Sequence, residues 1–352
     1  MRKIDYIEPY FHSNPNLYFV EELKKNEKDK IFINNNIIEI YYPKNISNEL
    51  YLIIPNNKSF NIDIIRILDN KAIKSLKGHN DYILSVRHFY NSKDKFDYLL
   101  SVEACSKVFI WDLTNNYKLK FTIEINYTVE ISDSLIIFDN YKNKDYILTS
   151  TYSNKKEDYS KLFSFEDKGK FITNIPSTNL NMTYYLIKWN NTKENNDVYI
   201  IECCYKIIYI YNLYNPNLNF KLKPILHESK NCSGYIIKKD NIDYLWTISY
   251  NGYINIFNLY SQLYIANIYI GYNYGFCNIV QWNKRYIIIS IIDRIKIIDI
   301  YQKKIVNNII LKGTNEIYLK KIMHPYYNES LLTIESNSSI KLWTKKNNII
   351  RE

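Results

Sequence analysis

Short apolar segments separated by polar turns recur along the whole chain. Within them the apolar side chains occupy alternate positions, as in VFIWD at Val108–Asp112 and IKIID at Ile295–Asp299. Alternation with a period of two places these side chains on one face of a β-strand. Many short alternating segments at regular spacing therefore predict an all-β fold.

One five-residue signature repeats along the chain, with two apolar positions around a variable residue, then an aromatic or aliphatic residue, then a polar one. The copies are Ile65–Asp69, Val108–Asp112, Leu162–Glu166, Ile208–Asn212, Ile254–Asn258, Ile295–Asp299 and Ile340–Thr344. Their last residues are 43, 54, 46, 46, 41 and 45 positions apart. Units of roughly 40–45 residues have the length of one β-propeller blade. The sequence thus predicts seven copies of one structural unit.

A second motif precedes each copy of the first. It starts with an acidic residue followed by an apolar or aromatic pair, as in DYLLS from Asp97, although the sixth unit has KRYIIIS from Lys284. Its distance to the fourth residue of the signature is 14 positions in five units, 19 in the first and 20 in the third. A constant interval is expected for two strands of one hairpin, because it sets their register. Repetition alone also allows an open β-solenoid.

The second unit carries the most complete version of the pattern. It opens with Gly78-His79 and closes with Trp111-Asp112. The apolar runs inside it predict strands at Ile83–Phe89, Asp97–Val102 and Val108–Leu113. A Gly-His pair followed some thirty residues later by Trp-Asp resembles one repeat of the WD40 family. The resemblance implies a single seven-bladed propeller whose blades each have four antiparallel strands, a to d from the centre outward.

The resemblance also predicts the domain organisation. Residues 1–28 are expected to form an N-terminal extension and residues 29–352 the propeller. The blades are expected at residues 35–77, 78–124, 125–176, 180–226, 232–270, 273–312 and 315–352. An N-terminal strand should complete the last blade and remove its open edge. For this strand we favour Lys30–Asn34 over Leu17–Leu23.

Strong repeats of this family contain a buried hydrogen-bond chain of a His, a strand-b Ser or Thr, a turn Asp and the Trp. Only the second unit supplies His79, Ser101 and Trp111 together, and Cys105 stands at the Asp position. We therefore expect polar locks to be largely absent and the ring to depend on apolar packing between blades. The residues assigned a structural role are Gly78, His79, Ser101, Trp111, Asp112 and Trp343.

Composition and charge change this picture little. The formal net charge is +10, and the bias toward Ile, Asn, Lys and Tyr, with 36 Tyr but only 7 Gly, is interpreted as genome composition. Nearly all basic residues are Lys, whereas bidentate recognition of phosphate or guanine favours the planar fork of Arg. Nucleic-acid binding therefore stays an alternative that is not favoured.

The cysteines and apolar runs bear on the compartment. Five cysteines without a CxxC pair predict neither a disulfide framework nor a zinc site. The first residues lack the apolar segment of a signal peptide. The most apolar run, Tyr286–Ile292, is too short to cross a membrane. We expect an intracellular protein, cytoplasmic or nuclear, that is neither secreted nor inserted in a membrane.

The sequence contains none of the common catalytic signatures. The chain has no P-loop and no GxGxxG, GxSxG or HExxH motif. Carboxylates such as Asp97, Asp145 and Asp243 recur with the repeat, which is typical of a strand-start device. The sequence therefore predicts no catalytic residue, no cofactor, no metal and no enzymatic activity. Ubiquitin-ligase receptors of this family carry an Arg two places after Trp-Asp, where this chain has Thr114.

A partner-binding patch is predicted beside the second unit. In this family the b–c turns and d–a loops share the docking face. The b–c segments Pro55–Asn61 and Ser153–Ser160 exceed the usual length by five and six residues and flank unit two. The predicted patch consists of Phe60, Lys58, Asn80, Asp81, Tyr82, Lys155, Lys156 and Tyr159. Tyrosines near the d–a loops should ring the same face: Tyr82, Tyr127, Tyr184, Tyr235, Tyr274 and Tyr318.

These observations favour one function and leave two alternatives. The favoured function is a non-enzymatic protein–protein interaction scaffold, a monomeric propeller within a hetero-complex whose protein partners are not identified by sequence. The first alternative is an RNA- or ribonucleoprotein-associated propeller that uses its Lys and Tyr surface. The second is a substrate adaptor in ubiquitin transfer.

Overall fold

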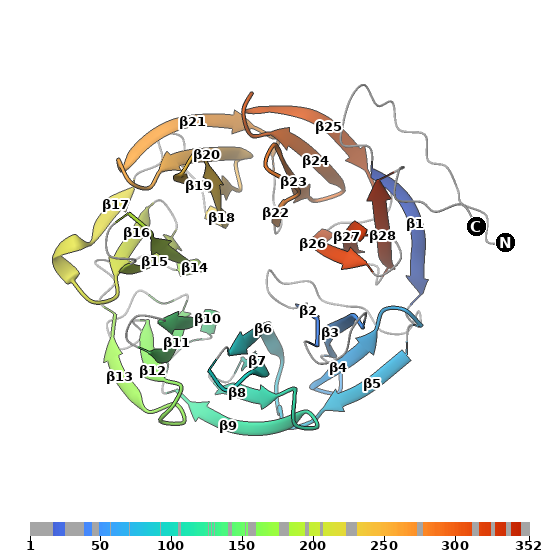
Figure 1. Ribbon diagram of the computed structural model, residues 1–352, viewed down its shortest axis with the longest axis vertical. Coiled ribbons are helices and arrows are strands. Elements are labelled where there is room, and N and C mark those ends of the chain that lie inside the picture. The colour runs from blue at the N-terminus through green and yellow to red at the C-terminus, as the bar shows by residue number, and fades with distance from the viewer. Residues whose placement is uncertain are drawn as a thin grey trace.

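The computed structural model is a closed ring of seven four-stranded sheets, which confirms the all-β propeller (Figure 1). The structure describes residues 17–24, 39–43 and 49–345, the last range with gaps. The gaps are residues 57, 70, 92, 105–106, 126, 128, 130, 140–142, 152, 154–159, 176–182, 194–196, 205–206, 223–230, 273–276, 312–316, 325–327 and 336–338.

The first four sheets follow one another along the chain. Blade 1 contains β2 (Glu39–Tyr41), β3 (Tyr51–Asn56), β4 (Asn61–Arg66) and β5 (Lys71–Leu76). Blade 2 contains β6 (Ile83–Asn91), β7 (Phe96–Glu103), β8 (Lys107–Asp112) and β9 (Lys118–Glu124). Blade 3 contains β10 (Ile131–Asp139), β11 (Lys144–Thr151), β12 (Lys161–Ser164) and β13 (Phe171–Asn174). Blade 4 contains β14 (Thr183–Asn191), β15 (Asp197–Cys204), β16 (Ile208–Asn212) and β17 (Phe220–Leu222), with the short 3-10 helix η2 (Pro216–Leu218) before β17.

The remaining three sheets complete the ring. Blade 5 contains β18 (Asn231–Lys239), β19 (Ile242–Ser249), β20 (Tyr253–Asn258) and β21 (Leu263–Tyr269). Blade 6 contains β22 (Ile279–Gln281), β23 (Tyr286–Ile291), β24 (Arg294–Asp299) and β25 (Lys304–Ile310). Blade 7 contains β26 (Ile317–His324), β27 (Asn328–Glu335), β28 (Ser339–Lys345) and, as its fourth strand, β1 (Leu17–Lys24). The three strands predicted for the second unit are confirmed by β6, β7 and β8.

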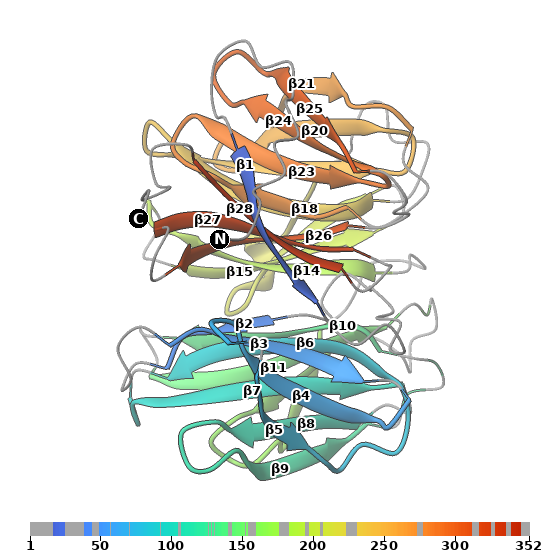
Figure 2. The same ribbon diagram turned by 90° about the vertical axis from the view of Figure 1, so that its right-hand side faces the viewer.

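The strand that closes the ring is β1, so the preference for Lys30–Asn34 was wrong. β1 pairs antiparallel with β28 along seven residue pairs (Figure 2). A bulge separates Phe19, opposite Trp343, from Glu21, opposite Leu342. The fourth strands of blades 1, 2, 3, 5 and 6 have a bulge at the equivalent position. β1 therefore serves as a strand d, and residues 30–34 lie outside the part of the chain described.

Apolar packing between neighbouring blades holds the ring together. The described core divides into seven clusters, each contributed by two adjacent blades. The cluster between the last and first blades joins Leu332 and Leu342 to Leu52 and Ile54. Each sheet is therefore apolar on both faces, which explains strands almost free of charge. Because blade 7 packs on blade 1 as the others pack on their neighbours, the open β-solenoid is excluded.

The register shows that the repeat signature was misplaced in two units. In blade 2 the d-strand bulge lies at Trp111, and in blades 1 and 3 it lies at Ile65 and Phe163. The sequence pattern had put Leu68 and Phe165 at the Trp position. Leu68 is 38% exposed, whereas Ile65 is 9% exposed, as an inward-packed strand residue should be. In an Ile-rich chain, neighbouring segments match the signature equally well, and only pairing decides between them.

Buried polar ties between blades, distinct from the hydrogen-bond lock within a blade, supplement the apolar contacts. Asp133 on β10 accepts two hydrogen bonds from Nη2 of Arg87 on β6, at 2.8 and 2.9 Å. Its Oδ2 also accepts from the backbone N–H of Leu186 on β14, at 2.8 Å. One fully buried carboxylate thus joins blades 2, 3 and 4. At the closure of the ring, Lys320 on β26 pairs with Glu39 on β2.

Glu202 is a buried carboxyl group whose titration should affect stability. It lies on β15, accepts a 2.6 Å hydrogen bond from Oγ of Ser160, and is fully buried. Burial raises the pKa of Glu202 from 4.5 to about 7. The folded protein therefore keeps a proton that the unfolded chain releases between those values. Its contribution to stability is present below pH 4.5 and lost as pH rises through 7.

We expect Glu202→Gln to flatten this pH dependence. The amide keeps an oxygen for the Ser160 hydroxyl but does not ionise. Between pH 5 and 7 the native protein should lose about 1.4 kcal/mol of unfolding free energy per pH unit relative to the variant. Urea unfolding at a series of pH values measures the difference. Parallel curves for the two proteins across this range would show that Glu202 does not titrate there.

Candidate interaction site on the loop face of blade 2

A chain of buried hydrogen bonds ties the start of blade 2 to its second and third strands. Nε1–H of Trp111 on β8 donates to Oγ of Ser101 on β7 at 2.8 Å. Ser101 Oγ lies 2.8 Å from Nε2 of His79, and Nδ1 of His79 lies 3.2 Å from Oε2 of Glu103. The donors and acceptors are consistent if the Ser101 hydroxyl donates to Nε2 and Nδ1–H donates to Glu103. Burial lowers the pKa of His79 to about 4, against the attraction of Glu103, so the ring is neutral.

Glu103 was missed as the acidic member of this chain. The repeat pattern predicted that member at position 105, which lies outside the described residues. Because β7 continues to Glu103, Ser101 and Glu103 are two residues apart in one strand and share a face. A carboxylate two residues after the strand-b Ser could therefore have predicted the acidic partner of His79 from the sequence. His79, Ser101 and Trp111 are joined by these hydrogen bonds, and the structural roles assigned to them stay predictions.

The same carboxylate orders the loop that leads into blade 2. Oε2 of Glu103 accepts the backbone N–H of Asn80 at 2.8 Å. The carbonyl of Tyr82 accepts the N–H of Ala104 at 2.9 Å. At Gly78 the φ angle is +153°, and an added Cβ would stand 3.3 Å from Cη2 of Trp111. Glycine therefore fits this turn better than any residue with a side chain.

Two aromatic rings of the predicted patch meet on this ordered loop. Tyr82 is 55% exposed, and its ring centroid lies 5.7 Å from that of Phe60 in an edge-to-face arrangement. Phe60 belongs to the b–c turn of blade 1, and Tyr82 to the d–a loop before blade 2. In the same segments, Lys58 and Asn80 are exposed and Asp81 is half-buried. The patch residues that lie outside the described chain are Lys155, Lys156 and Tyr159.

The turn that carries Phe60 is shorter than predicted. Strand β3 extends to Asn56 and β4 begins at Asn61, so Pro55 and Asn61 belong to strands. Four residues separate these strands, against three between β7 and β8. The apparent insertion arose from the misplaced signature in unit one. The connection in blade 3, from Thr151 to Lys161, is partly outside the described residues.

Blade 7 contains a partial copy of the blade 2 lock. Nε1–H of Trp343 donates to Oγ1 of Thr333 at 2.9 Å, which repeats the Trp111–Ser101 bond. Glu335 stands where Glu103 stands in blade 2, and it pairs with Nζ of Lys341 at 2.7 Å. Trp343 thus makes the same bond to strand b as Trp111 makes, and its structural role stays a prediction.

The carboxylates that recur once per unit make structural contacts. Oδ2 of Asp243 accepts Nε1–H of Trp189 at 2.9 Å and the hydroxyl of Tyr260 at 2.7 Å. Oδ1 of Asp97 lies 3.0 Å from Nε2 of His88. Among the described residues, no three His, Cys, Asp or Glu side chains are grouped so as to hold a metal ion. No helix in the described part of the chain has the length and apolar character to cross a membrane.

The predicted ring of tyrosines does not lie on one face. Tyr235 and Tyr318 line the central cavity of the propeller. The hydroxyl of Tyr127 lies 2.8 Å from Oγ1 of Thr149, inside blade 3. The side chains of Tyr184 and Tyr274 are outside the described part. Among the described tyrosines of the predicted ring, only Tyr82 is exposed, and its side chain lies next to Phe60.

Comparisons with known proteins identify the fold. No protein-family model and no curated protein matches the sequence. The crystal structure of BBS1N in complex with ARL6DN, soaked with lead, superposes with a TM-score of 0.69 at 10% identity, covering 95% of this chain and 98% of that chain. The mercury-soaked crystal of the same complex gives a TM-score of 0.68 at 9% identity, covering 94% and 96%. At this identity the similarity establishes the propeller architecture.

Proposed function

We propose that this chain is a WD40-type propeller that acts as a non-enzymatic protein-interaction scaffold within a multiprotein complex. One observation carries the proposal: the exposed Tyr82 ring packs edge-on against Phe60 on a loop that buried hydrogen bonds hold in place. The docking site is the loop face of blade 2, formed by these two rings together with Lys58, Asn80 and Asp81.

The physical argument concerns the cost of binding. Aromatic side chains bury much area with few rotatable bonds, and they are enriched among residues that dominate interface energies. The N–H of Asn80 donates to Glu103 and the N–H of Ala104 donates to the Tyr82 carbonyl, and these bonds order the loop before a partner arrives. Less conformational entropy is then lost on association. Protein partners are also supported by the similar BBS1N structure, which is a complex with ARL6DN.

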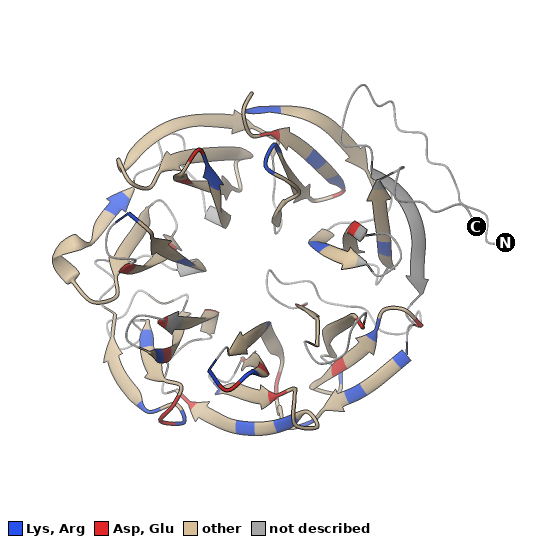
Figure 3. Cartoon of the chain, viewed as in Figure 1, with Lys and Arg blue, Asp and Glu red and all other residues tan. Residues whose placement is uncertain are grey.

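A second candidate function, binding to RNA, rests on a different surface. Exposed lysines lie along the outer strands of two adjacent blades, Lys71 and Lys74 on β5 and Lys118 and Lys120 on β9 (Figure 3). A phosphate backbone would be attracted to such a row, and binding would weaken steeply with added salt. The experiment on the loop face can separate the two functions.

We expect the double variant Phe60→Ala/Tyr82→Ala to lose its protein partner. Truncating two interface anchors should lower partner recovery at least about tenfold. Affinity purification with quantitative mass spectrometry measures the loss, with nuclease treatment and a salt series as parallel arms. The matched control is Tyr301→Ala, because Tyr301 is 49% exposed in a c–d turn on the opposite face.

The outcomes separate the candidate functions. Loss of a nuclease-resistant partner from the double variant, but not from Tyr301→Ala, supports the scaffold and its site. Unchanged recovery from the double variant overturns the site. Recovery that disappears with nuclease or falls steeply with salt replaces the scaffold proposal with RNA binding.

A further inference from the structure

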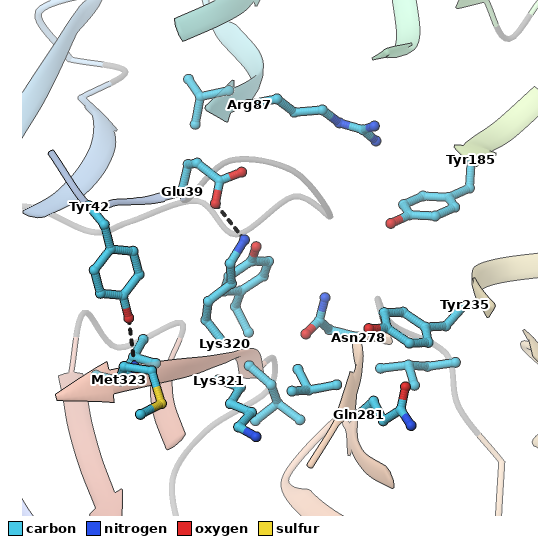
Figure 4. Close-up of a pocket in the computed structure, with 16 residues that line it drawn as sticks. Glu39, Tyr42, Arg87, Tyr185, Tyr235, Asn278, Gln281, Lys320, Lys321 and Met323 are labelled. Carbon is cyan, nitrogen blue, oxygen red and sulfur yellow. Dashed lines mark hydrogen bonds and ion pairs between the residues drawn. The ribbon is translucent and has the colours of Figure 1, made fainter. Parts of the chain in front are cut away.

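The centre of the ring contains a large cavity lined by both apolar and polar side chains. Its volume is about 780 Å³, within the usual range of small-molecule sites. First strands from five blades and residues around β2 contribute to it, as Figure 4 shows for the labelled side chains. The polar lining residues are Glu39, Tyr42, Arg87, Tyr185, Tyr235, Asn278, Gln281, Tyr318, Lys320 and Lys321. The protein-interaction face on blade 2 does not use these residues.

Two cations stand in front of their carboxylate partners in this cavity. The Arg87 side chain is 17% exposed, while that of its partner Asp133 is completely buried. The Lys320 side chain is 32% exposed, against 14% for its partner Glu39. Both cations are therefore more accessible than the carboxylates with which they pair, although Glu39 also lines the cavity. The two ion pairs hold both cations in fixed positions and leave them accessible to a ligand.

Both carboxylates are further satisfied from the protein side. Asp133 accepts the backbone N–H of Leu186 at 2.8 Å, and Glu39 accepts its neighbour's N–H, that of Ile40, at 2.9 Å. Burial opposes ionisation of Glu39, but Lys320 and these hydrogen bonds hold its pKa below the usual value. These backbone N–H donors offset part of the negative charge of the two carboxylates. The accessible surface of the cavity is therefore more positive than the count of charges indicates.

Several donors in the cavity have no acceptor among the described residues. Nη2 of Arg87 makes both bonds to Asp133, and Nε and Nη1 of Arg87 make no hydrogen bond with the described residues. The hydroxyls of Tyr185, Tyr235 and Tyr318 also make none with described residues. Burial raises the pKa of Tyr185 to about 12, so its hydroxyl stays protonated and able to donate at neutral pH.

One acceptor in the cavity has no donor. Oδ1 of Asn278 is buried and makes no hydrogen bond with the described chain. Buried polar atoms normally have a partner, and a persistent exception points to a group that the protein alone does not supply. A hydroxyl on a bound molecule fits this oxygen, because a hydroxyl can donate to it.

We propose that the central cavity binds a small hydroxylated oxyanion. Its carboxylate or phosphate groups contact Arg87 and Lys320, the tyrosine hydroxyls donate to its remaining oxygens, and its hydroxyl donates to Asn278. Charge-assisted hydrogen bonds to fixed cations supply most of the affinity. The proposal goes beyond the scaffold function and does not depend on it.

Isothermal titration of the full chain at constant ionic strength tests this site with four probes. Citrate carries carboxylates and a hydroxyl, and glycerol 3-phosphate carries a phosphate and hydroxyls. Tricarballylate is citrate without the hydroxyl, and glycerol has no charge. We expect one molecule of citrate or of glycerol 3-phosphate to bind per chain. Which of the two binds shows whether the site takes a carboxylate or a phosphate. If citrate binds, tricarballylate should bind less tightly; glycerol should not bind.

Two variants locate the binding. Glu39→Gln/Lys320→Gln removes both charges together, so neither is left buried without its partner. This variant should lower the affinity for the anion at least about tenfold. Tyr235→Phe removes one hydroxyl while keeping the ring, and should weaken binding about threefold. The matched control, Lys107→Gln/Glu124→Gln, removes an exposed ion pair of blade 2 and should bind like the native chain. Thermal unfolding checks that each variant is folded.

Two results would overturn the proposal. One is the absence of heat from both anions at millimolar concentration with folded native protein. The other is equal affinity in the native chain and in a folded Glu39→Gln/Lys320→Gln variant, which would place the anion elsewhere. Equal binding of citrate and tricarballylate would overturn the assignment of the hydroxyl to Asn278.

Discussion

Replacing Asp133 by alanine should lower the free energy of unfolding by about 3–5 kcal/mol. The substitution leaves the Arg87 guanidinium, at 17% side-chain exposure, without its carboxylate. It also leaves the buried N–H of Leu186 without an acceptor. Three blades lose a common contact at once, since these partners lie on β6 and β14 and Asp133 lies on β10. Urea unfolding followed by tryptophan fluorescence measures the change.

A double substitution separates the unpaired charge from the lost packing. Arg87→Met/Asp133→Asn removes both charges and keeps an amide oxygen for the Leu186 N–H. It should lose less stability than Asp133→Ala, because no cation remains without a partner. A loss of less than about 1 kcal/mol in Asp133→Ala would contradict the role of this carboxylate in tying the blades.

Deleting residues 1–24 should open the ring and remove the stable monomer. Without β1, the outer edge of β28 loses its seven paired residues, and its unpaired N–H and C=O groups can recruit another chain. Trp343 and Leu342, which are almost fully buried in the intact blade, lose the strand beside them. We expect the midpoint of thermal unfolding to fall by more than about 10 °C, and the protein to associate. Calorimetry and light scattering measure the two effects.

A shorter deletion and an added peptide serve as controls. Removing residues 1–16 alone keeps β1, so the midpoint should fall less than after deletion of residues 1–24. A synthetic peptide of residues 17–24, added to the truncated chain, should restore part of the lost stability by pairing with β28. A monomeric truncated chain with the native midpoint would show that β1 is dispensable.

The ring itself could be predicted because its signal is local and repeated. Strands b and c form a hairpin in each unit, so their alternation and interval lie within about 20 contiguous residues. Blade 2 shows this directly, since β7 and β8 begin and end within two residues of the predicted strands. Seven repetitions then allowed weak individual signals to reinforce one another. Phe60 and Tyr82, which the sequence pattern placed in one patch, have rings in contact, and their role in partner binding stays a prediction.

Other features depended on contacts between distant residues. The misplaced signature in units one and three could be corrected only from the pairing of Ile65 and Phe163 with their neighbours. Glu103 as the partner of His79 required the true end of β7. The ion pair between Lys320 and Glu39 in the central cavity joins residues 281 positions apart. No sequence interval constrains such a contact.

By itself, the sequence determined the all-β class, the number of blades and the strands of the best repeat, because alternation and spacing follow from backbone geometry. Closure by Leu17–Lys24, the blade-to-blade tie through Asp133 and the cationic surface of the central cavity were decided only by the tertiary structure. The physical reason is that curvature brings one residue from each of several first strands to a common centre. The position of a residue around that centre depends on the register of every blade, which the linear sequence leaves open.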